Sequence, residues 1–384
     1  MNTEDFTVYR KVMPERKPMY QEFPPSLHPD IRKFLKLEGI SSLYSHQAEM
    51  YEKAQEGKHV VITTSTASGK TLSFLLPVLQ EILKNPLTRA VFVYPTKALA
   101  SDQYRALKPV LEYFGEGRIN AGVYDGDTMQ AERSRIRKSA NIILTNPEML
   151  NSAFLPNHSS YGFDFIFSNL KYVVIDELHT YRGAFGAHLA NIFRRMKRIC
   201  GYYGSKPRFL CSSATIANPE ELAEKICGEK FVLVDQDGSG APQKEYRLLL
   251  PPEIKGKNDK IYGRRPASYL AAELIPALAA GGHHFIVFGR SRRNVEVILK
   301  EARDKMEGNG ISRKIAGYRG GYTSLERKSI EEKMITGELA GLVSTNALEL
   351  GIDIGNLDCT VLAGYPGTRA SFWQQTGRAG RSKE

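Results

Sequence analysis

The sequence predicts an α/β protein with two domains, each built on a parallel β-sheet covered by helices. Three observations lead to this fold class. Short apolar stretches typical of buried strands alternate with amphipathic stretches typical of helices along most of the chain. A stretch rich in Gly, Pro and small polar residues, Asp235–Pro242, interrupts the alternation and marks a domain boundary. The 384 residues, 42% of them hydrophobic, are enough to fill two cores.

Seven strands are expected in the first domain, which we place at residues 26–238. They lie near Val60 and at Ala90–Tyr94, Ile119–Tyr124, Asn141–Thr145, Tyr172–Ile175, Arg208–Ser212 and Phe231–Val234. An amphipathic pattern predicts a helix over Leu72–Leu83. Asn218 followed by Pro219 is typical of a helix start. Strands and helices therefore alternate throughout this domain.

The second domain, residues 239–384, repeats the alternation. Its strands are predicted at Phe285–Phe288, Lys314–Ala316, Gly341–Ser344 and Cys359–Leu362. Thr323 and Glu326 have the spacing of a capping box that opens a helix. The N-terminal extension, residues 1–25, is polar and interrupted by prolines, so we expect it to run extended along the first domain or to be disordered.

Composition narrows the class of protein. Lys and Arg give the chain a net charge of +11, which suits a polyanionic partner, although many basic proteins bind no nucleic acid. The four cysteines form no C-x-x-C pair, which argues against a zinc site or a disulfide framework. The first twenty residues lack the apolar core of a signal peptide, and Tyr269–Ala280 is too short to span a bilayer. We expect a cytoplasmic protein with no membrane partner and, by default, a monomer.

A phosphate-binding loop is indicated at Thr64–Thr71, with the sequence TSTASGKT. It ends like the pattern G-x-x-x-x-G-K-[ST], in which backbone amides surround the phosphates, the Lys reaches the β and γ phosphates, and the hydroxyl binds magnesium. Thr64 replaces the first Gly, and an ordinary Ser/Gly/Lys loop is the alternative. A predicted strand before the loop and a helix after it favour the phosphate loop. The expected ATP ligands here are Thr64, Ser65, Thr66, Ala67, Ser68, Gly69, Lys70 and Thr71.

Two adjacent carboxylates follow another predicted strand. Asp176 and Glu177 come directly after the apolar run KYVVI, at the carboxyl end where parallel sheets bind ligands. In phosphate-loop enzymes an Asp at this place holds magnesium, partly through water, and a neighbouring carboxylate can polarise the attacking water. Adjacent carboxylates alone are more often a solvated surface. Their place after a strand favours catalysis, with Thr71 and Asp176 as the magnesium ligands.

The motifs, taken in order, resemble those of superfamily 2 helicases of the DExH type. The resemblance rests on Gln47, Thr64–Thr71, Pro95–Lys97, Asp176–His179, Ser213–Thr215, Ser344–Asp353 and Gln374–Arg381. Within the superfamily, Leu43–Gln47 and Asp176–Gly183 are similar to the bacterial YprA/MrfA group of DNA repair helicases, which are related to the Hrq-type, RecQ-four-like helicases. The resemblance implies two tandem RecA-like (P-loop NTPase) domains with parallel sheets, and ATP and Mg²⁺ as cofactors.

The resemblance also implies a role for residues outside the phosphate loop. Arg378 and Arg381 would reach the γ-phosphate, because a planar cation stabilises charge on the transferring phosphoryl group. Gln47 would read adenine, since its amide both donates and accepts. Tyr44 could stack on the base or simply pack in the core. Asp353 resembles the carboxylate that meets the ribose. A solvated arginine pair is the alternative for the C-terminal run.

Nucleic acid would be gripped by residues at strand and helix ends, because small hydroxyls, backbone amides and arginines there hold a backbone without reading bases. The positions that match this nucleic-acid track are Thr96, Lys97, Thr145, Arg290, Ser291, Arg319, Gly320 and Thr345. Each of them alone could be an ordinary helix cap. Residues expected to couple the ATP site to the track are His179, Ser213, Thr215 and Gln374. A buried structural histidine is the alternative for His179.

The expected function is an ATP-dependent helicase or translocase on single-stranded DNA or on DNA with a single-stranded tail. Movement from 3′ to 5′ and a place in DNA repair follow from the resemblance alone. An RNA helicase and a nucleotide-gated DNA clamp without turnover are the alternatives; the 2′-hydroxyl separates the first of them. The chain stops three residues after Arg381, whereas the resembled family continues, so we expect it to be truncated.

Overall fold

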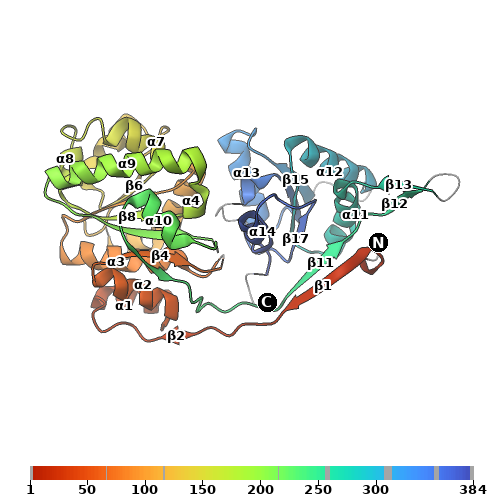
Figure 1. The fold of residues 1–384 in the computed structure, drawn as a ribbon, viewed down its shortest axis with the longest axis horizontal. Helices are drawn as coiled ribbons and strands as arrows, with labels where there is room; N and C mark the ends of the chain where they lie inside the picture. The colour runs from red at the N-terminus through yellow and green to blue at the C-terminus, as the bar shows by residue number, and fades with distance from the viewer. Residues whose placement is uncertain are drawn as a thin grey trace. The chain divides into compact units, whose positions relative to one another are not determined.

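The structure is a computed structural model that describes residues 3–65, 67–115, 117–214, 216–255, 260–306, 314–349 and 354–380. The chain forms two compact units, Pro18–Ser239 and a second one that combines Met1–Lys17 with Gly240–Glu384 (Figure 1). Each unit contains one parallel sheet with helices around it. The predicted α/β fold with two parallel sheets is therefore confirmed.

The unit Pro18–Ser239 is built on a seven-stranded sheet in the order β10-β4-β9-β8-β5-β7-β6, and every neighbouring pair is parallel. Its strands are β4 (His59–Thr63), β5 (Arg89–Val93), β6 (Ala121–Val123), β7 (Ile142–Thr145), β8 (Leu170–Ile175), β9 (Arg208–Ser213) and β10 (Phe231–Val234). All seven predicted strands are present. Their carboxyl ends lie at one edge, which is where the candidate motifs follow them.

Both faces of this sheet are buried. Consecutive side chains of a strand point to opposite faces, and in β4 the side chains on both faces lie in a hydrophobic cluster. Val60 and Ile62 join one hydrophobic cluster and Val61 joins the other. The helices of the unit are α1 (Pro29–Leu37), α2 (Ser45–Gln55), α3 (Lys70–Lys84), α4 (Lys97–Ala106), α5 (Lys108–Phe114), α6 (Gln130–Ser139), α7 (Pro147–Met149), α8 (Phe163–Ser168), α9 (Gly183–Tyr202) and α10 (Pro219–Cys227). Apolar runs without alternation, such as Val60–Ile62, follow from this double burial.

The other unit carries a four-stranded parallel sheet in the order β15-β16-β14-β17. Its strands are β14 (Phe285–Phe288), β15 (Ile315–Tyr318), β16 (Gly341–Ser344) and β17 (Cys359–Leu362), and its helices are α11 (Ala267–Ala280), α12 (Arg292–Lys305), α13 (Ser324–Ile335) and α14 (Arg369–Thr376). The four predicted strands are present. The capping box is also confirmed: the Glu326 amide donates to the Thr323 hydroxyl, and the Thr323 amide donates to the Glu326 carboxylate.

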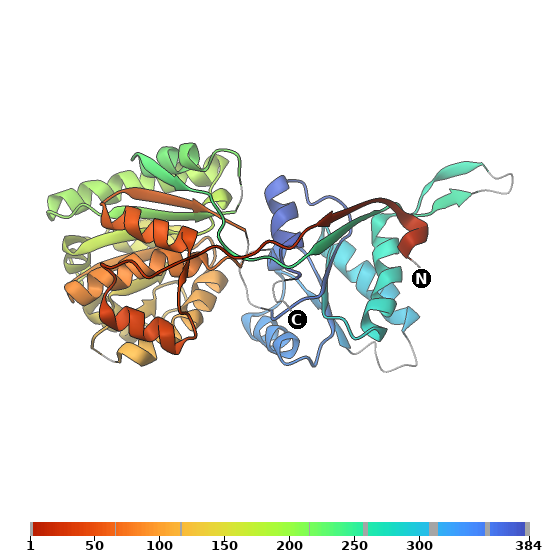
Figure 2. The same ribbon diagram turned by 90° about the horizontal axis from the view of Figure 1, so that it is seen from below.

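Only part of the N-terminal extension takes the predicted path along the first domain: residues 18–25 belong to that unit, whereas Met1–Lys17 belong to the other. Strand β1 (Thr7–Met13) pairs antiparallel with β11 (Lys244–Leu249), and both belong to the unit of the four-stranded sheet. Figure 2 shows the two strands side by side. Periodicity could not reveal this pairing, because nearly all of β1 is exposed and its partner lies more than 200 residues along the chain.

Two further strand pairs were not predicted. They are β2 (Tyr20–Gln21) with β3 (Leu43–Tyr44) and β12 (Glu253–Lys255) with β13 (Ile261–Arg264); all are short, and all but β3 are mostly exposed. Short exposed strands carry little hydrophobic pattern, so sequence alone gives them little weight. Across the described segments, every helix is too short or too polar to cross a lipid bilayer.

Candidate nucleotide-binding site

The phosphate loop connects β4 to α3 and is closed by its own polar groups. Thr64 and Ser68 are buried, and their hydroxyl oxygens lie 2.6 Å apart in a hydrogen bond. The Lys70 ammonium donates to the carbonyl oxygens of Thr64 and Ser65, both at 2.9 Å. Thr64 thus replaces the expected Gly by contributing a side-chain bond that fixes the turn. The lysine that would meet the phosphates lies against the same two carbonyls.

Gln47 packs against the end of the loop. Its amide nitrogen donates to the Gly69 carbonyl at 3.1 Å, and its amide oxygen accepts from the Tyr44 backbone at 3.0 Å. Gly69 has φ +78°, and a Cβ there would lie 2.5 Å from the Gln47 amide nitrogen. The positive φ therefore favours glycine at this position. The adenine role expected for Gln47 stays a prediction, since both ends of its amide already contact the protein.

Tyr44 is stacked between two other rings. Its centroid lies 5.4 Å from that of Tyr20 and 5.7 Å from that of His46, with interplanar angles of 19° and 20°. Tyr44 is the N-cap residue of α2 and only half-buried, so it is not the core helix residue that the spacing suggested. Stacking of Tyr44 on a base remains a prediction.

The paired carboxylates lie at the end of β8, two strands from the phosphate loop. The Asp176 carboxylate accepts hydrogen bonds from the Ser212 hydroxyl and, at 2.9 Å, from the Glu177 amide. Burial, and then the charge of Glu177, raises the pKa of Asp176 to about 6, while Ser212 and Lys70 act in the opposite direction. Glu177 has a left-handed backbone with φ +52°. Such strain at a non-glycine residue is typical of functional sites.

A cation fits this carboxylate pair. Two acidic groups side by side in a buried place repel each other, and a divalent ion bound by oxygen ligands relieves that repulsion. The Thr71 hydroxyl, at the start of α3, donates to the Gln103 side chain at 3.2 Å. Asp176 and Thr71 are thus the candidate magnesium ligands, one charged and one neutral. No group of three or more His, Cys, Asp or Glu side chains in the described residues forms an all-protein metal site.

The carboxylates connect to the end of β9 through two side chains. The His179 Nδ1 accepts the Ala214 amide at 3.2 Å and lies 3.4 Å from a Glu177 carboxylate oxygen. Because Nδ1 is an acceptor in this arrangement, the ring proton is on Nε2 and Glu177 is a close neighbour of Nδ1, not its hydrogen-bond partner. His179 therefore lies between the carboxylates and the end of β9, and its coupling role stays a prediction.

Sequence reasoning assigned the second coupling role to Ser213, but its neighbour Ser212 makes the contact with Asp176. Successive strand residues point to opposite faces of the sheet, so only one of the two hydroxyls can lie on the same face as the Asp176 side chain. The Ser213 hydroxyl is buried without a hydrogen-bond partner within the described part of the chain. Ser212 was missed because the neighbours β8 and β9 are known only from the sheet order.

The first residues of the nucleic-acid track lie at the ends of β5 and β7. In the sheet, β5 is the neighbour of β8, and β7 is the next strand after β5. Thr96 and Lys97 are exposed at the start of α4, where the Thr96 hydroxyl caps the Leu99 amide at 3.3 Å and Lys97 pairs with Asp127 at 3.1 Å. Thr145 is different, because it is fully buried and its hydroxyl donates to the Tyr124 carbonyl at 2.7 Å. Direct phosphate contact by the Thr145 hydroxyl is therefore not supported, and the side chain instead fixes the end of β6 to β7.

The remaining track residues follow three strands of the four-stranded sheet. Arg290 and Ser291 are exposed after β14, and Ser291 caps α12 by accepting the Asn294 amide at 3.1 Å. Arg319 and Gly320 follow β15, and Arg319 pairs with Glu296 at 2.9 Å. Thr345 follows β16, where its hydroxyl accepts the Ala347 amide at 3.4 Å. Parallel strands bring these positions to one edge of that sheet.

Arg378 lies just beyond α14 and is only 2% exposed. Its charge lowers the pKa of the nearby Tyr318 phenol, against the stronger effects of burial and of Glu331, which together raise that pKa. The following residues are fixed, since the Gly380 amide donates to the Leu357 carbonyl at 2.8 Å. Gln374 is buried on α14. Four other predicted site residues, Thr66, Thr215, Asp353 and Arg381, lie outside the described residues.

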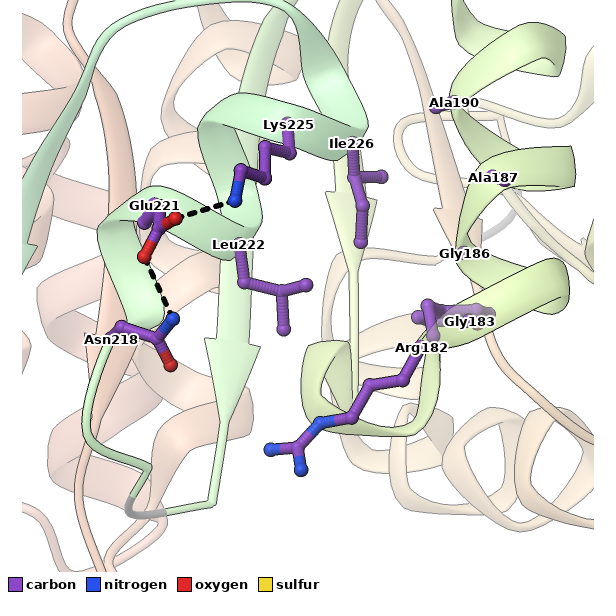
Figure 3. Close-up of a pocket in the computed structure, with 11 residues that line it drawn as sticks. Arg182, Gly183, Gly186, Ala187, Ala190, Asn218, Glu221, Leu222, Lys225 and Ile226 are labelled. Atoms are coloured by element: carbon purple, nitrogen blue, oxygen red, sulfur yellow. Dashed lines mark hydrogen bonds and ion pairs between the residues drawn. The ribbon is translucent and has the colours of Figure 1, made fainter.

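A separate groove of about 420 Å³ lies between α9 and α10 (Figure 3). Small residues line it on α9, and Leu222 and Ile226 face it from α10. Glu221 accepts from Asn218 at 2.8 Å and pairs with Lys225 at 2.5 Å, so the charges on this rim compensate each other. The groove shows no arrangement of phosphate-binding or acid–base groups. The candidate phosphate-binding and acid–base groups instead lie at the ends of β4, β8 and β9.

The chain is similar to known helicases. Residues 44–222 match the DEAD/DEAH box helicase family, and residues 268–383 match the helicase conserved C-terminal domain. The ATP-dependent helicase YprA of Bacillus subtilis is 46% identical over 366 residues, which cover 95% of this chain and 48% of YprA. The ATP-dependent helicase hrq1 of Schizosaccharomyces pombe is 41% identical over 349 residues, 89% of this chain and 32% of hrq1.

Among solved structures, the DUF1998 helicase MrfA bound to DNA and AMPPNP superposes with a TM-score of 0.92 at 44% identity, over 98% of this chain and 52% of that one. The helicase Lhr of Mycobacterium smegmatis, bound to ssDNA and AMP-PNP, gives a TM-score of 0.73 at 25% identity, over 93% of this chain and 46% of that one. The chain spans about half the length or less of the relatives it matches. The RecA-like character of both units follows from these matches.

Proposed function

The chain belongs to the DEAD/DEAH box helicases of the YprA, MrfA and Hrq1 kind, which are ATP-hydrolysing enzymes, and we propose that it is a DNA translocase that moves on single-stranded DNA from 3′ to 5′. The observation that carries the proposal is the order of polar groups along one sheet edge. The phosphate loop follows β4, Ser213 is the last residue of β9, the carboxylates follow β8, and Thr96 and Lys97 follow β5. These four strands are neighbours in the sheet.

In this order, each step of ATP hydrolysis would use residues at the end of a different strand. Lys70 would hold the phosphates, and Asp176 with Thr71 would hold Mg²⁺, which supplies the charge that stabilises the transferring phosphoryl group. Glu177 would orient and deprotonate the attacking water. Its close neighbour His179 contacts Ala214, so a shift at the carboxylates would be transmitted to the end of β9. Arg378 would complete the stabilisation of charge from the second RecA-like domain.

The grip would be sequence-independent. Lys97 and Arg290 are exposed and cationic, and the helix starts capped by Thr96 and Ser291 present backbone amides. We place the ATP-binding domain at residues 26–238 and the second domain at 239–384. A single-stranded DNA or a tailed duplex as partner, a cytoplasmic location and a role in DNA repair extend from the relatives and belong to the same proposal.

The test compares steady-state ATP hydrolysis without nucleic acid, with single-stranded DNA and with single-stranded RNA of the same sequence. We expect the DNA to stimulate hydrolysis more strongly than the RNA, and this stimulation to weaken as salt rises. Strand displacement from duplexes with a 3′ or a 5′ tail then tests the polarity. Stimulation by RNA alone would reject the DNA proposal, and nucleotide-dependent DNA binding without any hydrolysis would favour a clamp.

A further inference from the structure

The segment that leaves the phosphate-loop unit is bonded to the loop itself. The last residues before the chain enters the other unit are Asp237, Gly238 and Ser239. One Asp237 carboxylate oxygen accepts the Ser65 amide at 3.0 Å. The other oxygen accepts the Ser239 amide at 2.9 Å and the Ser239 hydroxyl at 2.6 Å. Asp237 therefore joins the loop to a turn in the exit segment.

His46 makes a second bond between the same two segments. Its Nδ1 accepts the Gly238 amide at 3.1 Å, and its Nε2 lies 3.0 Å from the Ser68 carbonyl. Both bonds form together only when the ring is neutral with its proton on Nε2. A Cβ on Gly238 would lie 2.2 Å from the Ser45 hydroxyl oxygen, so the close approach requires glycine. Two points of the phosphate loop, Ser65 and Ser68, are thus linked to consecutive residues of the exit segment.

The bond to Ser65 occupies a group that belongs to the nucleotide's surroundings. Ser65 is the second residue of the loop, whose backbone amides face the phosphates in this motif. Its carbonyl accepts from Lys70, while its amide donates to Asp237. Burial acts to raise the pKa of Asp237, but the hydrogen bonds from Ser239 and Ser65 outweigh it and hold that pKa well below its usual range. Asp237 is therefore an anion next to a phosphate-binding loop.

We propose that Asp237 is a positioning residue that competes with the bound nucleotide for the Ser65 amide, so that the loop holds either the exit segment or the triphosphate. A carboxylate anion and a triphosphate repel each other when both lie at the same amide. One amide hydrogen also serves only one strong acceptor at a time. Binding of ATP then releases the segment that leads into the other unit. The inference rests on the proposed binding of ATP by the phosphate loop. It adds a connection between that loop and the segment that leads into the other unit.

The test substitutes Asp237→Asn and measures the affinity of a fluorescent ATP analogue with Mg²⁺ by equilibrium titration of the whole chain. The single amide oxygen can keep the Ser239 turn, but the charge and the second acceptor are lost. We expect the analogue to bind about tenfold more tightly, because a charge-assisted hydrogen bond no longer has to be broken. Equal or weaker binding by this variant would overturn the proposal, because Asp237 would then only support the loop.

The matched control is Asp235→Asn, which removes the same charge from the same segment at an exposed position. We expect it to bind the analogue within about twofold of the wild-type affinity, since an exposed charge contributes little. An equal gain in affinity for both variants would show a general electrostatic effect and would also overturn the proposal. Failure of the wild-type chain to bind any analogue would count against the proposed ATPase function, and is thus a distinguishable result.

A second readout follows the segment directly by hydrogen exchange of the peptide that contains residues 233–241. In the wild-type chain the analogue should speed exchange at the Gly238 amide, because release of the segment separates that amide from its acceptor on His46. In Asp237→Asn the Gly238 amide should already exchange faster without nucleotide, because the neighbouring link to Ser65 is lost, and its exchange should change little on binding. Exchange that slows on nucleotide binding in the wild-type chain contradicts the proposal.

Discussion

The seven-stranded and the four-stranded sheets are both parallel, but the polar groups at their carboxyl edges are held in different ways. In the first, the half-buried Asp176 accepts a hydrogen bond from the buried Ser212, and the buried Thr64 bonds to the buried Ser68. In the second, Arg290 and Ser291 are exposed at helix starts. A buried network fixes geometry for chemistry, whereas exposed caps can grip a sliding polymer. Burial thus separates the groups proposed for chemistry from those proposed for grip, and Thr96 and Lys97, exposed at the edge of the seven-stranded sheet, belong with the second kind.

Arg378 is the exception to this division, since it belongs to the four-stranded unit and is almost fully buried. If it acts on the γ-phosphate, Arg378→Ala should lower kcat by roughly 10³- to 10⁵-fold, with the ATP affinity much less affected. Single-turnover hydrolysis together with nucleotide titration measures both. Arg369→Ala, at an exposed arginine that begins α14, is the control. A loss of thermal stability with less than a tenfold change in kcat would limit Arg378 to a structural role beside Tyr318.

Glu177→Gln tests whether the strained carboxylate is the catalytic base. The amide keeps the size of the side chain but cannot take a proton, so we expect hydrolysis to fall by roughly 10²- to 10⁴-fold while ATP still binds. Lys70→Ala should instead weaken binding as well, because Lys70 also holds the carbonyls of Thr64 and Ser65. Glu112→Gln, at an exposed position of α5, is the matched control. Near wild-type turnover in Glu177→Gln would remove this residue from the catalytic role.

How far the sequence predicted the site differs between these two sheets. Every strand of both sheets could be predicted, because buried parallel strands are continuous apolar runs with polar motifs at their ends. The hydrogen-bond partners of the site side chains could not be predicted, because they depend on which strands are neighbours in the sheet. Ser212 faces Asp176 only because β9 lies beside β8. Thr145 was predicted to contact a nucleic-acid phosphate, but its buried hydroxyl donates a hydrogen bond to the Tyr124 carbonyl.

The exit segment shows a second limit of sequence reasoning. Its Gly and Ser content predicted a boundary, and Ser239 is indeed the last residue of its unit. Nothing in the pattern indicated that Asp237 and Gly238 return to the phosphate loop, 172 residues away from Ser65 along the chain. Contacts of this kind arise from the path of the backbone after the last strand. They carry no periodic signal.

Lys97 and Thr145 offer a direct test of exposed grip against buried support. Lys97→Ala should weaken single-stranded DNA binding by several-fold and lower the slope of log affinity against log salt by about 1, because one phosphate contact is lost. Its exposed ion pair with Asp127 contributes little to stability. Thr145→Val should leave both DNA measures unchanged and cost about 1 kcal/mol of folding stability, through the lost bond to Tyr124. DNA binding lost in Thr145→Val at unchanged stability would reverse this assignment.

The smallest effect expected concerns the pKa of Asp176, which burial and the neighbouring Glu177 raise to about 6. At pH 8 the carboxylate is ionised and free to bind Mg²⁺, whereas at pH 5.5 most of it is protonated and the cation must displace the proton. The Mg²⁺ concentration that half-saturates binding of a fluorescent ATP analogue should therefore rise by roughly fourfold between these pH values, beyond any change due to the nucleotide itself. Asp176→Asn supplies that baseline, because its side chain does not titrate. The same pH dependence in wild type and Asp176→Asn would show that the buried carboxylate is not a ligand of the metal, and the seven-stranded sheet would then hold its catalytic cation by other groups.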